Sequence, residues 1–383
     1  MRRLFVVLAA VVLVGLLPLA GLCAQLDVEG KSALLMDVST GKILYESNAH
    51  EKLAPASVTK VMTMLLIMEA VDSGQIALED PVTASENAAA KGGSQIFLKA
   101  GETMSVSDML KSIAVSSAND CACAMAEHLA GSEQAFVARM NERAKELGME
   151  DTNFVNCTGL DDSPEAVNHR TSAHDIALMS RELLKNHPLI KNYTTIWMDT
   201  VRNGTFGLSN TNKLVKFYQG ATGLKTGFTS GAGYCLSASA FRDGMELVAV
   251  VMGAETSQGR NAACKQLLDY GFANYALVSP ELSHVPEIPV KLGKAPSVAP
   301  RLGENGQLLI DKAIRGNITT HYAMEEFLTA PVSKGQRLGT LTIKAGEQEL
   351  AQIPLVAEEG VERLTWWELF VKVLRQLAMA KRE

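Results

Sequence analysis

The sequence is short of the features that mark several common protein classes. Aromatic residues make up only 5% of the 383 residues, and no cluster of basic residues interleaved with aromatics occurs. Together with a formal net charge of −6, these absences argue against a nucleic-acid surface, so we expect no nucleic-acid partner. The seven histidines are scattered, and none has the spacing to cysteine that a zinc site requires. We therefore predict neither a metal nor another cofactor.

Long hydrophobic runs are also few, and the longest lies at the N-terminus. Arg2 and Arg3 precede an apolar run from Leu4 to Leu22, which is typical of a signal peptide. We predict that residues 1–24 are this signal and that cleavage follows Ala24. A retained membrane anchor is the alternative, whereas a lipoprotein is disfavoured because Leu22, before Cys23, is not small. Each interpretation places the rest of the chain at the outer face of the cytoplasmic membrane, in the periplasm or cell-wall space.

Cysteine is scarce as well, with six residues in the whole chain. Removal of Cys23 with the signal would leave an odd number, which does not suit a framework of disulfides. We interpret the others mostly as small, buried, apolar side chains; they are Cys121, Cys123, Cys157, Cys235 and Cys264.

The remaining chain is long enough for about two domains. In residues 25–277, strand patterns occur at both ends and helix patterns lie between them, so the fold class is α+β. We expect one antiparallel sheet, built from the two ends and carrying a helical insertion. Residues 278–360 contain clustered prolines and short alternating runs, which predict a small β-sandwich. The helices that we expect in the first domain span residues 58–70, 107–114, 120–129, 132–147, 172–184 and 261–275.

The last segment, residues 361–383, has the pattern of an amphipathic helix. Apolar residues recur at steps of three and four, and Trp366 and Trp367 accompany several basic residues. This composition favours a helix that lies in a membrane interface, because charges interrupt it too often for it to span a bilayer. Docking of the helix on its own β-domain is the alternative.

A candidate nucleophile stands at the start of a nearly apolar helix. Ser57 and Lys60 are three positions apart, so on a helix their side chains lie on one face. A buried lysine with a lowered pKa can accept the proton of a serine hydroxyl and so activate it. The spacing alone is weak evidence, because Ser39 and Lys42 share it in what we predict to be a hairpin turn.

Two further short motifs follow in a fixed order. Ser117-Ala118-Asn119 stands in a loop between two predicted helices, and Lys225-Thr226-Gly227 stands on a predicted strand. A serine three residues before a lysine, then Ser-x-Asn, then Lys-Thr-Gly is the set found in penicillin-binding proteins and serine β-lactamases. Each motif is short, but their order and their placement on helix, loop and strand reinforce one another.

Longer stretches strengthen this resemblance. They are residues 92–98, 153–160 and 223–229, and all are similar to the D-alanyl-D-alanine carboxypeptidases, which are low-molecular-mass penicillin-binding proteins. The resemblance covers roughly residues 30 to 275, and that family also has a β-domain and a terminal amphipathic helix. It implies a β-lactamase- or transpeptidase-like fold and removal of the terminal D-alanine from peptidoglycan stem pentapeptides, with β-lactams as covalent inhibitors.

The resemblance also implies roles for single residues. Ser57 would form an acyl-enzyme, with Lys60 taking its proton, and Ser117 would relay a proton to the leaving amine. Asn119 would contact the substrate amide and Lys60. The substrate's terminal carboxylate would meet the following residues: Lys225, Thr226, Gly227 and Arg260. The N–H groups of Ser57 and of a residue just after Gly227, with Thr229 preferred to Phe228, would form the oxyanion hole.

Three other functions share these motifs and stay open. A β-lactamase needs a deacylating base, and Glu165 is the nearby candidate, although it reads equally well as part of a surface loop. A transpeptidase would pass the same acyl group to an amine. A non-enzymatic wall-binding protein would have no need of Ser57, Lys60 and Lys225 together.

Overall fold

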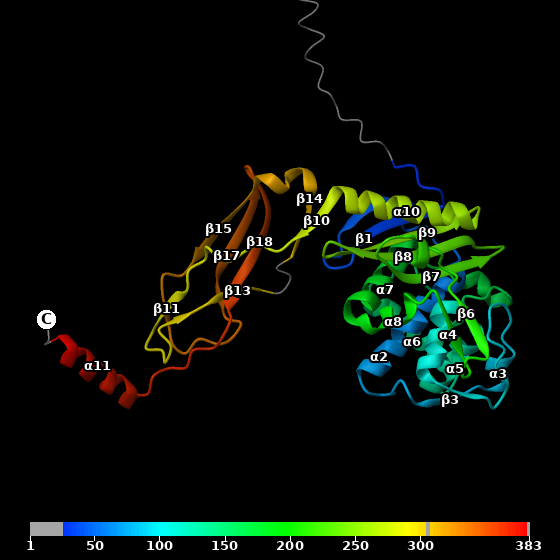
Figure 1. Cartoon of the computed structure of the whole chain (residues 1–383), viewed down its shortest axis with the longest axis horizontal. Helices are drawn as coiled ribbons and strands as arrows, with labels where there is room; N and C mark the ends of the chain where they lie inside the picture. The colour runs from blue at the N-terminus through cyan, green and yellow to red at the C-terminus, as the bar shows by residue number, and fades with distance from the viewer. Residues whose placement is uncertain (1–25, 304–306, 381–383) are drawn as a thin grey trace, which may run out of the picture.

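The computed structural model describes residues 26–303 and 307–380 of the chain. The predicted signal peptide, residues 1–24, lies outside the described residues. Figure 1 shows a sheet-and-helix region, residues 26–274, followed by an elongated β-rich region and a terminal helix at the far end. The candidate site residues all lie in the first region.

A five-stranded sheet organises the first region. Its strand order is β2-β1-β9-β8-β7, and every neighbouring pair is antiparallel. Strands from the two ends of the region meet in the middle of the sheet, as β1 pairs with β9 along six residues. This confirms the predicted sheet with a helical insertion. The bounds are β1 (Ser32–Asp37), β2 (Ile43–Ser47), β7 (Ala221–Thr229), β8 (Gly233–Arg242) and β9 (Met245–Ala254).

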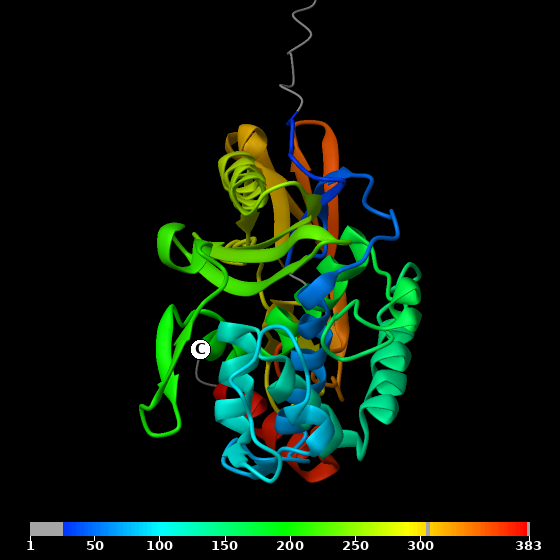
Figure 2. The ribbon, with the colours of Figure 1, turned by 90° about the vertical axis from the view of Figure 1, so that its right-hand side faces the viewer.

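Both faces of this sheet are covered, which explains why the four central residues of β1 are all apolar. Leu34 and Met36 face one hydrophobic core, whereas Ala33 and Leu35 face the other, because successive strand side chains point to opposite faces. The helix α10 (Ser257–Asn274) covers the second face, and the helical insertion covers the first (Figures 1 and 2).

The insertion contains the predicted helices other than that of residues 261–275, which is α10, and their ends differ from the predicted ones by a few residues. Serine side chains accept a hydrogen bond from the backbone three residues later at the start of four helices, which is the usual N-cap arrangement. Two small ribbons, β3–β4 and β5–β6, were not predicted from the sequence. The insertion comprises η1 (Ala56–Thr59), α2 (Lys60–Asp72), β3 (Pro81–Thr83), α3 (Glu86–Ala89), β4 (Thr103–Ser105), α4 (Val106–Ser116), α5 (Asn119–Ala130), α6 (Glu133–Glu146), η2 (Pro164–Asn168), α7 (Ala173–Asn186), η3 (Pro188–Ile190), α8 (Lys191–Thr194), β5 (Met198–Val201), β6 (Phe206–Ser209) and α9 (Leu214–Phe217).

The second region is built mainly from antiparallel strands around a core of its own, with β11 and β16 paired in parallel, which confirms the predicted β-domain. The strand β10 follows α10 directly and pairs with β14, so it joins the two regions. The elements are β10 (Tyr275–Val278), β11 (Ile288–Lys291), β12 (Ser297–Val298), β13 (Pro300–Leu302), β14 (Leu308–Asp311), η4 (Lys312–Asn317), β15 (Ile318–Met324), β16 (Leu328–Thr329), β17 (Arg337–Ala345) and β18 (Gln348–Ala357).

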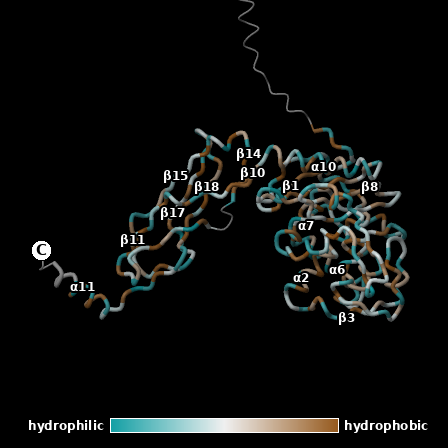
Figure 3. Tube along the Cα trace, viewed as in Figure 1, coloured by the Kyte–Doolittle hydropathy of each residue, from teal (hydrophilic) through white to brown (hydrophobic). Residues whose placement is uncertain are grey.

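The terminal helix α11 (Trp366–Ala380) projects from the end of the β-rich region that is farther from the sheet (Figure 1). Trp366 and Trp367 are 74% and 65% exposed, and Phe370 stacks on Trp366. Hydrophobic segments therefore face solvent along its described turns (Figure 3). Among residues 26–303 and 307–380, no helix combines the length and the apolar character needed to cross a bilayer.

Candidate active site

The candidate nucleophile lies in a tight turn that precedes the long helix. The sequence predicted one helix from residue 58 to 70, whereas the structure places a 3-10 turn, η1, before α2 begins at Lys60. Residues three apart eclipse one another on a 3-10 turn, so Ser57 and Lys60 still face each other. Ala56 holds a positive φ of 48°, and Ser57, the next residue, is half-buried.

Lys60 is fully buried and contacts the serine directly. Its Nζ lies 2.9 Å from Ser57 Oγ and 2.8 Å from the carbonyl oxygen of Thr158. Burial lowers the pKa of Lys60 to about 7, and the charge of Asp120 partly opposes that shift. A substantial share of neutral amine is therefore present near neutral pH, and that form can accept a proton from Ser57.

The loop that holds Lys60 passes very close to the serine turn. Thr158 precedes Gly159, which has a φ of +80°. A Cβ at Gly159 would lie 1.8 Å from the carbonyl oxygen of Ala56. Only glycine fits this position, because any side chain would push the loop and the serine turn apart.

The strand β7 forms the opposite wall and brings the Lys-Thr-Gly motif to the turn. A Cβ at Gly227 would lie 2.6 Å from the oxygen of Pro55 and 3.1 Å from the nitrogen of Ser57, so glycine permits this approach. Lys225 is buried, and its pKa falls well below the usual value because of burial and then the charges of Lys60 and Arg260. The three basic side chains therefore lie close enough for their charges to act on one another.

Two neighbouring hydroxyls and one arginine complete that wall. The hydroxyl of Thr226 donates a hydrogen bond of 2.6 Å to Thr211 Oγ1. Arg260, on the first turn of α10, is buried, and its guanidinium lies 5.7 Å from the ring centre of Tyr234. Thr229, the last residue of β7, accepts a hydrogen bond from the nitrogen of Ala232.

The Ser-x-Asn motif joins α4 to α5. Ser117 adopts a left-handed conformation with φ of 64°, which ends α4, and Asn119 begins α5. Asn119 Nδ2 donates to the oxygen of Gly92 at 2.7 Å, whereas its buried Oδ1 has no partner among the described residues. Burial of an acceptor without a donor costs free energy. Oδ1 of Asn119 is therefore available to accept a hydrogen bond from an N–H group.

Asp120 was missed by sequence reasoning, although it directly follows the motif. Its buried carboxylate accepts hydrogen bonds from the backbone nitrogens of Ile96 and Leu98. It thus fastens the loop of residues 92–98 to α5, beside Asn119. An aspartate in the first turn of a helix is normally interpreted as a cap. That local pattern does not predict hydrogen bonds to a distant loop.

Other polar clusters lie away from the motif residues. Glu69, Glu182 and His187 are spaced as metal ligands could be, but the guanidinium of Arg143 bonds both carboxylates at 2.7 and 2.8 Å. That cation satisfies the charge that a metal would neutralise.

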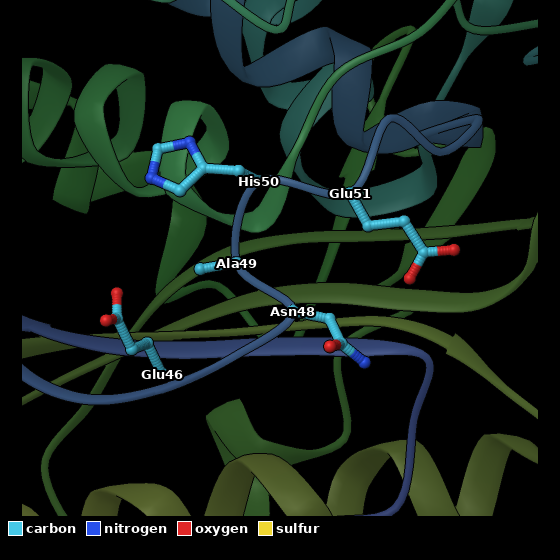
Figure 4. Close-up of a pocket in the computed structure, with 5 residues that line it drawn as sticks. All are labelled: Glu46, Asn48, Ala49, His50 and Glu51. Atoms are coloured by element: carbon cyan, nitrogen blue, oxygen red, sulfur yellow. The ribbon is translucent and has the colours of Figure 1, made fainter.

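A surface hollow next to β2 is lined mainly by polar side chains, but it contains none of the motif residues. The ring of His50 is paired with Asp151 outside it. The hollow's lining residues are Glu46, Asn48, Ala49, His50 and Glu51 (Figure 4).

The cysteines belong to the hydrophobic cores. All five in the described residues are buried and form no disulfide bond. Cys123 and Cys157 lie against the carboxylate of Glu133, at 3.8 and 3.3 Å. Contact with Cys123, burial and the charge of Glu133 raise the pKa of Cys157 well above its usual value. This suits the interpretation of these residues as small core side chains.

Comparison with known proteins identifies the chain's family. The family model described as D-alanyl-D-alanine carboxypeptidase matches residues 21–256, which include all the motif residues except Arg260. The chain belongs to the D-alanyl-D-alanine carboxypeptidase family. This confirms the enzyme class predicted from the motifs, a serine-type D-Ala-D-Ala carboxypeptidase. A second model, the C-terminal domain of penicillin-binding protein 5, matches residues 283–363.

Relatives with similarity along most of the chain agree with this assignment. D-alanyl-D-alanine carboxypeptidase DacF of Bacillus subtilis is 45% identical over 346 residues, covering 89% of this chain and 88% of that protein. DacC of Escherichia coli is 35% identical and covers 88% and 85% of the two chains.

Solved structures extend the agreement to both regions of the fold. Penicillin-binding protein 5 from Haemophilus influenzae matches with a TM-score of 0.74 and 31% identity, covering 88% of this chain and 98% of that one. The ampicillin-bound penicillin-binding protein D2 of Listeria monocytogenes has a TM-score of 0.59 and 33% identity, covering 64% and 99%.

Proposed function

We propose that this carboxypeptidase works through an acyl-enzyme on Ser57 and removes the terminal D-alanine of peptidoglycan stem pentapeptides. The observation that carries this proposal is the 2.9 Å contact between Ser57 Oγ and Lys60 Nζ, made by a fully buried lysine. Neutral Lys60 accepts the hydroxyl proton while Ser57 Oγ bonds to the carbonyl carbon of the penultimate D-alanine. In the neutral amine, one N–H of Lys60 donates to the carbonyl oxygen of Thr158, and the lone pair of Nζ accepts the proton of Ser57.

Release of D-alanine requires a proton on its departing nitrogen. As the C–N bond breaks, that proton passes from Lys60 through the hydroxyl of Ser117, which lies at the same junction as Asn119. Water then hydrolyses the Ser57 ester and restores the serine. The unpartnered Oδ1 of Asn119 accepts the substrate's amide N–H, which removes the cost of a buried acceptor without a donor.

The cationic wall recognises the terminal carboxylate of the substrate. Lys225 and Arg260 supply positive charge, and Thr226 and Gly227 line the same strand. The approach of a carboxylate raises the pKa of Lys225 back toward its usual range, because an opposite charge favours the ammonium form. Substrate binding therefore stabilises the charged form of Lys225 that burial disfavours.

Backbone N–H groups hold the oxyanion in this proposal. The close approach of Gly227 to the nitrogen of Ser57 brings β7 beside the serine turn. The nitrogen of Ser57 and that of Thr229, near the end of β7, supply the two donors. Donors of this kind contribute about 3 to 4 kcal/mol each to transition-state stabilisation in comparable sites.

We also propose that β-lactams acylate Ser57 and inhibit the enzyme. The strained amide and adjacent carboxylate of a β-lactam present the same groups as the D-Ala-D-Ala end. Support comes from relatives whose solved structures contain ampicillin and cefotaxime.

We place the enzyme at the outer face of the cytoplasmic membrane, held there by α11. Its exposed aromatic residues, Trp366, Trp367 and Phe370, are grouped on the first turns. Tryptophan and basic residues on one amphipathic helix favour an interfacial position rather than a spanning one. Vesicle binding should fall when residues 361–383 are removed, and unchanged binding would contradict this placement.

One assay tests the central proposal. Purified protein is given a peptide that ends in Lys-D-Ala-D-Ala, and free D-alanine is measured beside Ser57→Ala. Release that disappears in the variant supports the acyl-enzyme. Release without loss in the variant contradicts it, and acylation by penicillin without release favours a transpeptidase, which added acceptor amines would reveal.

A further inference from the structure

A buried histidine that none of the motifs includes touches the residue between Ser57 and Lys60. His169 is 3% exposed and follows η2, more than a hundred residues along the chain from the serine turn. Its Nε2 lies 2.8 Å from Thr59 Oγ1, and its Nδ1 lies 3.1 Å from the backbone nitrogen of Val155. Both ring nitrogens therefore have a defined partner.

These contacts fix the proton on the imidazole. The backbone N–H of Val155 can only donate, so Nδ1 of His169 must be the unprotonated acceptor. The neutral ring then carries its hydrogen on Nε2 and donates it to Thr59 Oγ1. Thr59 can accept this bond because its own hydrogen goes to the carbonyl oxygen of Ala56, at 2.8 Å. The chain of donors runs in one direction from Val155 to Ala56.

That chain ends on the serine turn itself. Ala56 is the residue with the positive φ, and the bond from Thr59 to its oxygen closes η1 around Ser57. Phe154 packs edge-on against the imidazole, with ring centres 5.7 Å apart. The backbone on both sides is also held, since Asn153 and Arg170 form an isolated antiparallel bridge.

We propose that His169 is a positioning residue, which acts through Thr59 to hold the nucleophile turn in its reactive shape. This inference rests on the proposed function, because it takes Ser57 as the nucleophile. A protonated imidazole could not make both hydrogen bonds, because its Nδ1–H would face the N–H of Val155. Burial, followed by the charges of Arg170 and Lys60, lowers the pKa of His169 to about 4, so the neutral ring persists through the pH range in which Lys60 is a base.

Two substitutions separate the two bonds of the ring. In His169→Gln the amide nitrogen reaches the position of Nε2 and can still donate to Thr59. In His169→Asn the shorter side chain presents its oxygen near the position of Nδ1, which keeps the Val155 bond and loses the one to Thr59. The first-order rate of Ser57 acylation by a fluorescent penicillin, measured at saturation, should fall by roughly 10- to 100-fold in the asparagine variant. The glutamine variant should retain a clearly higher rate of acylation than the asparagine variant. His128→Gln, on the exposed face of α5, serves as the control.

The partner residue gives an independent test. Thr59→Ser keeps the hydroxyl, whereas Thr59→Val keeps the volume and removes it. If one hydrogen bond carries the effect, His169→Asn combined with Thr59→Val should be no slower than Thr59→Val alone. If the rate losses of the two single variants instead multiply in the double variant, the proposal is contradicted. So would equal rates in the two His169 variants when both unfold at the wild-type temperature.

A spectroscopic measurement covers the case in which these variants do not fold. Nitrogen-15 spectra of the wild-type imidazoles should show one ring that keeps its proton on Nε2 at pH 6, and acylation by penicillin should leave its tautomer unchanged. A signal for the Nδ1–H tautomer, or a charged His169 at pH 6, would overturn the proposal. Failure of the proposed function looks different: wild-type protein would not be acylated at all, whatever the state of His169.

Discussion

Two regions of this molecule contain a serine and a lysine at the same spacing, and we propose that only one of them is a reaction centre. Ser39 and Lys42 lie on the turn between β1 and β2, where Lys42 is exposed and Ser39 Oγ donates to Gln307 of the β-rich region at 2.6 Å. Ser57 and Lys60 lie at the entrance to α2, where Lys60 has no exposed surface. The two side chains in the second region are in contact at 2.9 Å.

The difference lies in what surrounds each lysine. Around Lys60, α2, the loop of residues 153–160 and β7 exclude water, so the ammonium form loses its hydration and the pKa falls to about 7. Lys42 keeps its contact with water, and its side chain is free to move away from the serine. Spacing brings two groups within reach, whereas burial makes one of them a base.

The largest expected contrast comes from deletion of each serine. Ser57→Ala should abolish D-alanine release, with a loss on the order of 10⁶-fold as for other serine nucleophiles. Ser39→Ala should leave release near the wild-type rate, because it removes one exposed hydrogen bond. Measurement of kcat/KM for both variants tests this, and comparable losses would mean that the first Ser-x-x-Lys turn also matters for chemistry.

The next contrast concerns pH. Lys60 accepts a proton only when neutral, so kcat/KM should rise about tenfold per pH unit below its pKa of about 7 and level off above it. Lys42→Gln should leave this profile in place. A profile that is flat between pH 5 and 8 would show that Lys60 is not the base.

Two glycines with similar φ angles sharpen the comparison further. Gly159→Ala should slow acylation and lower the free energy of unfolding by about 1 to 3 kcal/mol, because its Cβ would meet the oxygen of Ala56 at 1.8 Å. Gly41→Ala, beside Lys42, has a φ of +75° but meets only the flexible Arg181 side chain, at 3.1 Å. It should cost less stability and leave acylation unchanged. Thermal unfolding and penicillin labelling measure both effects.

The smallest effect is expected at Glu165. Its side chain is exposed on the short helix η2, as in the surface-loop interpretation. Glu165→Ala should therefore leave D-alanine release within about 0.5 kcal/mol of the wild-type barrier, as at other exposed positions. Penicillin turnover should be slow in both proteins. Rapid hydrolysis of penicillin that vanishes in the variant would instead identify a β-lactamase.

Much of the fold could be predicted from local patterns. Caps such as Ser105, Ser132 and Ser172, and the apolar run of β1, depend on neighbours a few residues away, so the chain displays them directly. The ribbons β3–β4 and β5–β6 were missed because strands of three or four residues carry too little pattern. The 3-10 turn at Ser57 was missed because its closure depends on Thr59 and on the distant His169.

The sequence by itself determined the order of the three motifs, the class of enzyme they indicate, and the sheet built from the two ends of one region. Only the tertiary structure decided which Ser-x-x-Lys pair is buried, why Gly159 and Gly227 are glycines, and which distant residues contact the turn that holds Ser57. The physical reason is that hydration, steric approach and hydrogen-bond direction depend on groups far away in the chain. The lowered pKa of Lys60 comes from the core that buries it, and no local pattern at residues 57–60 contains that information.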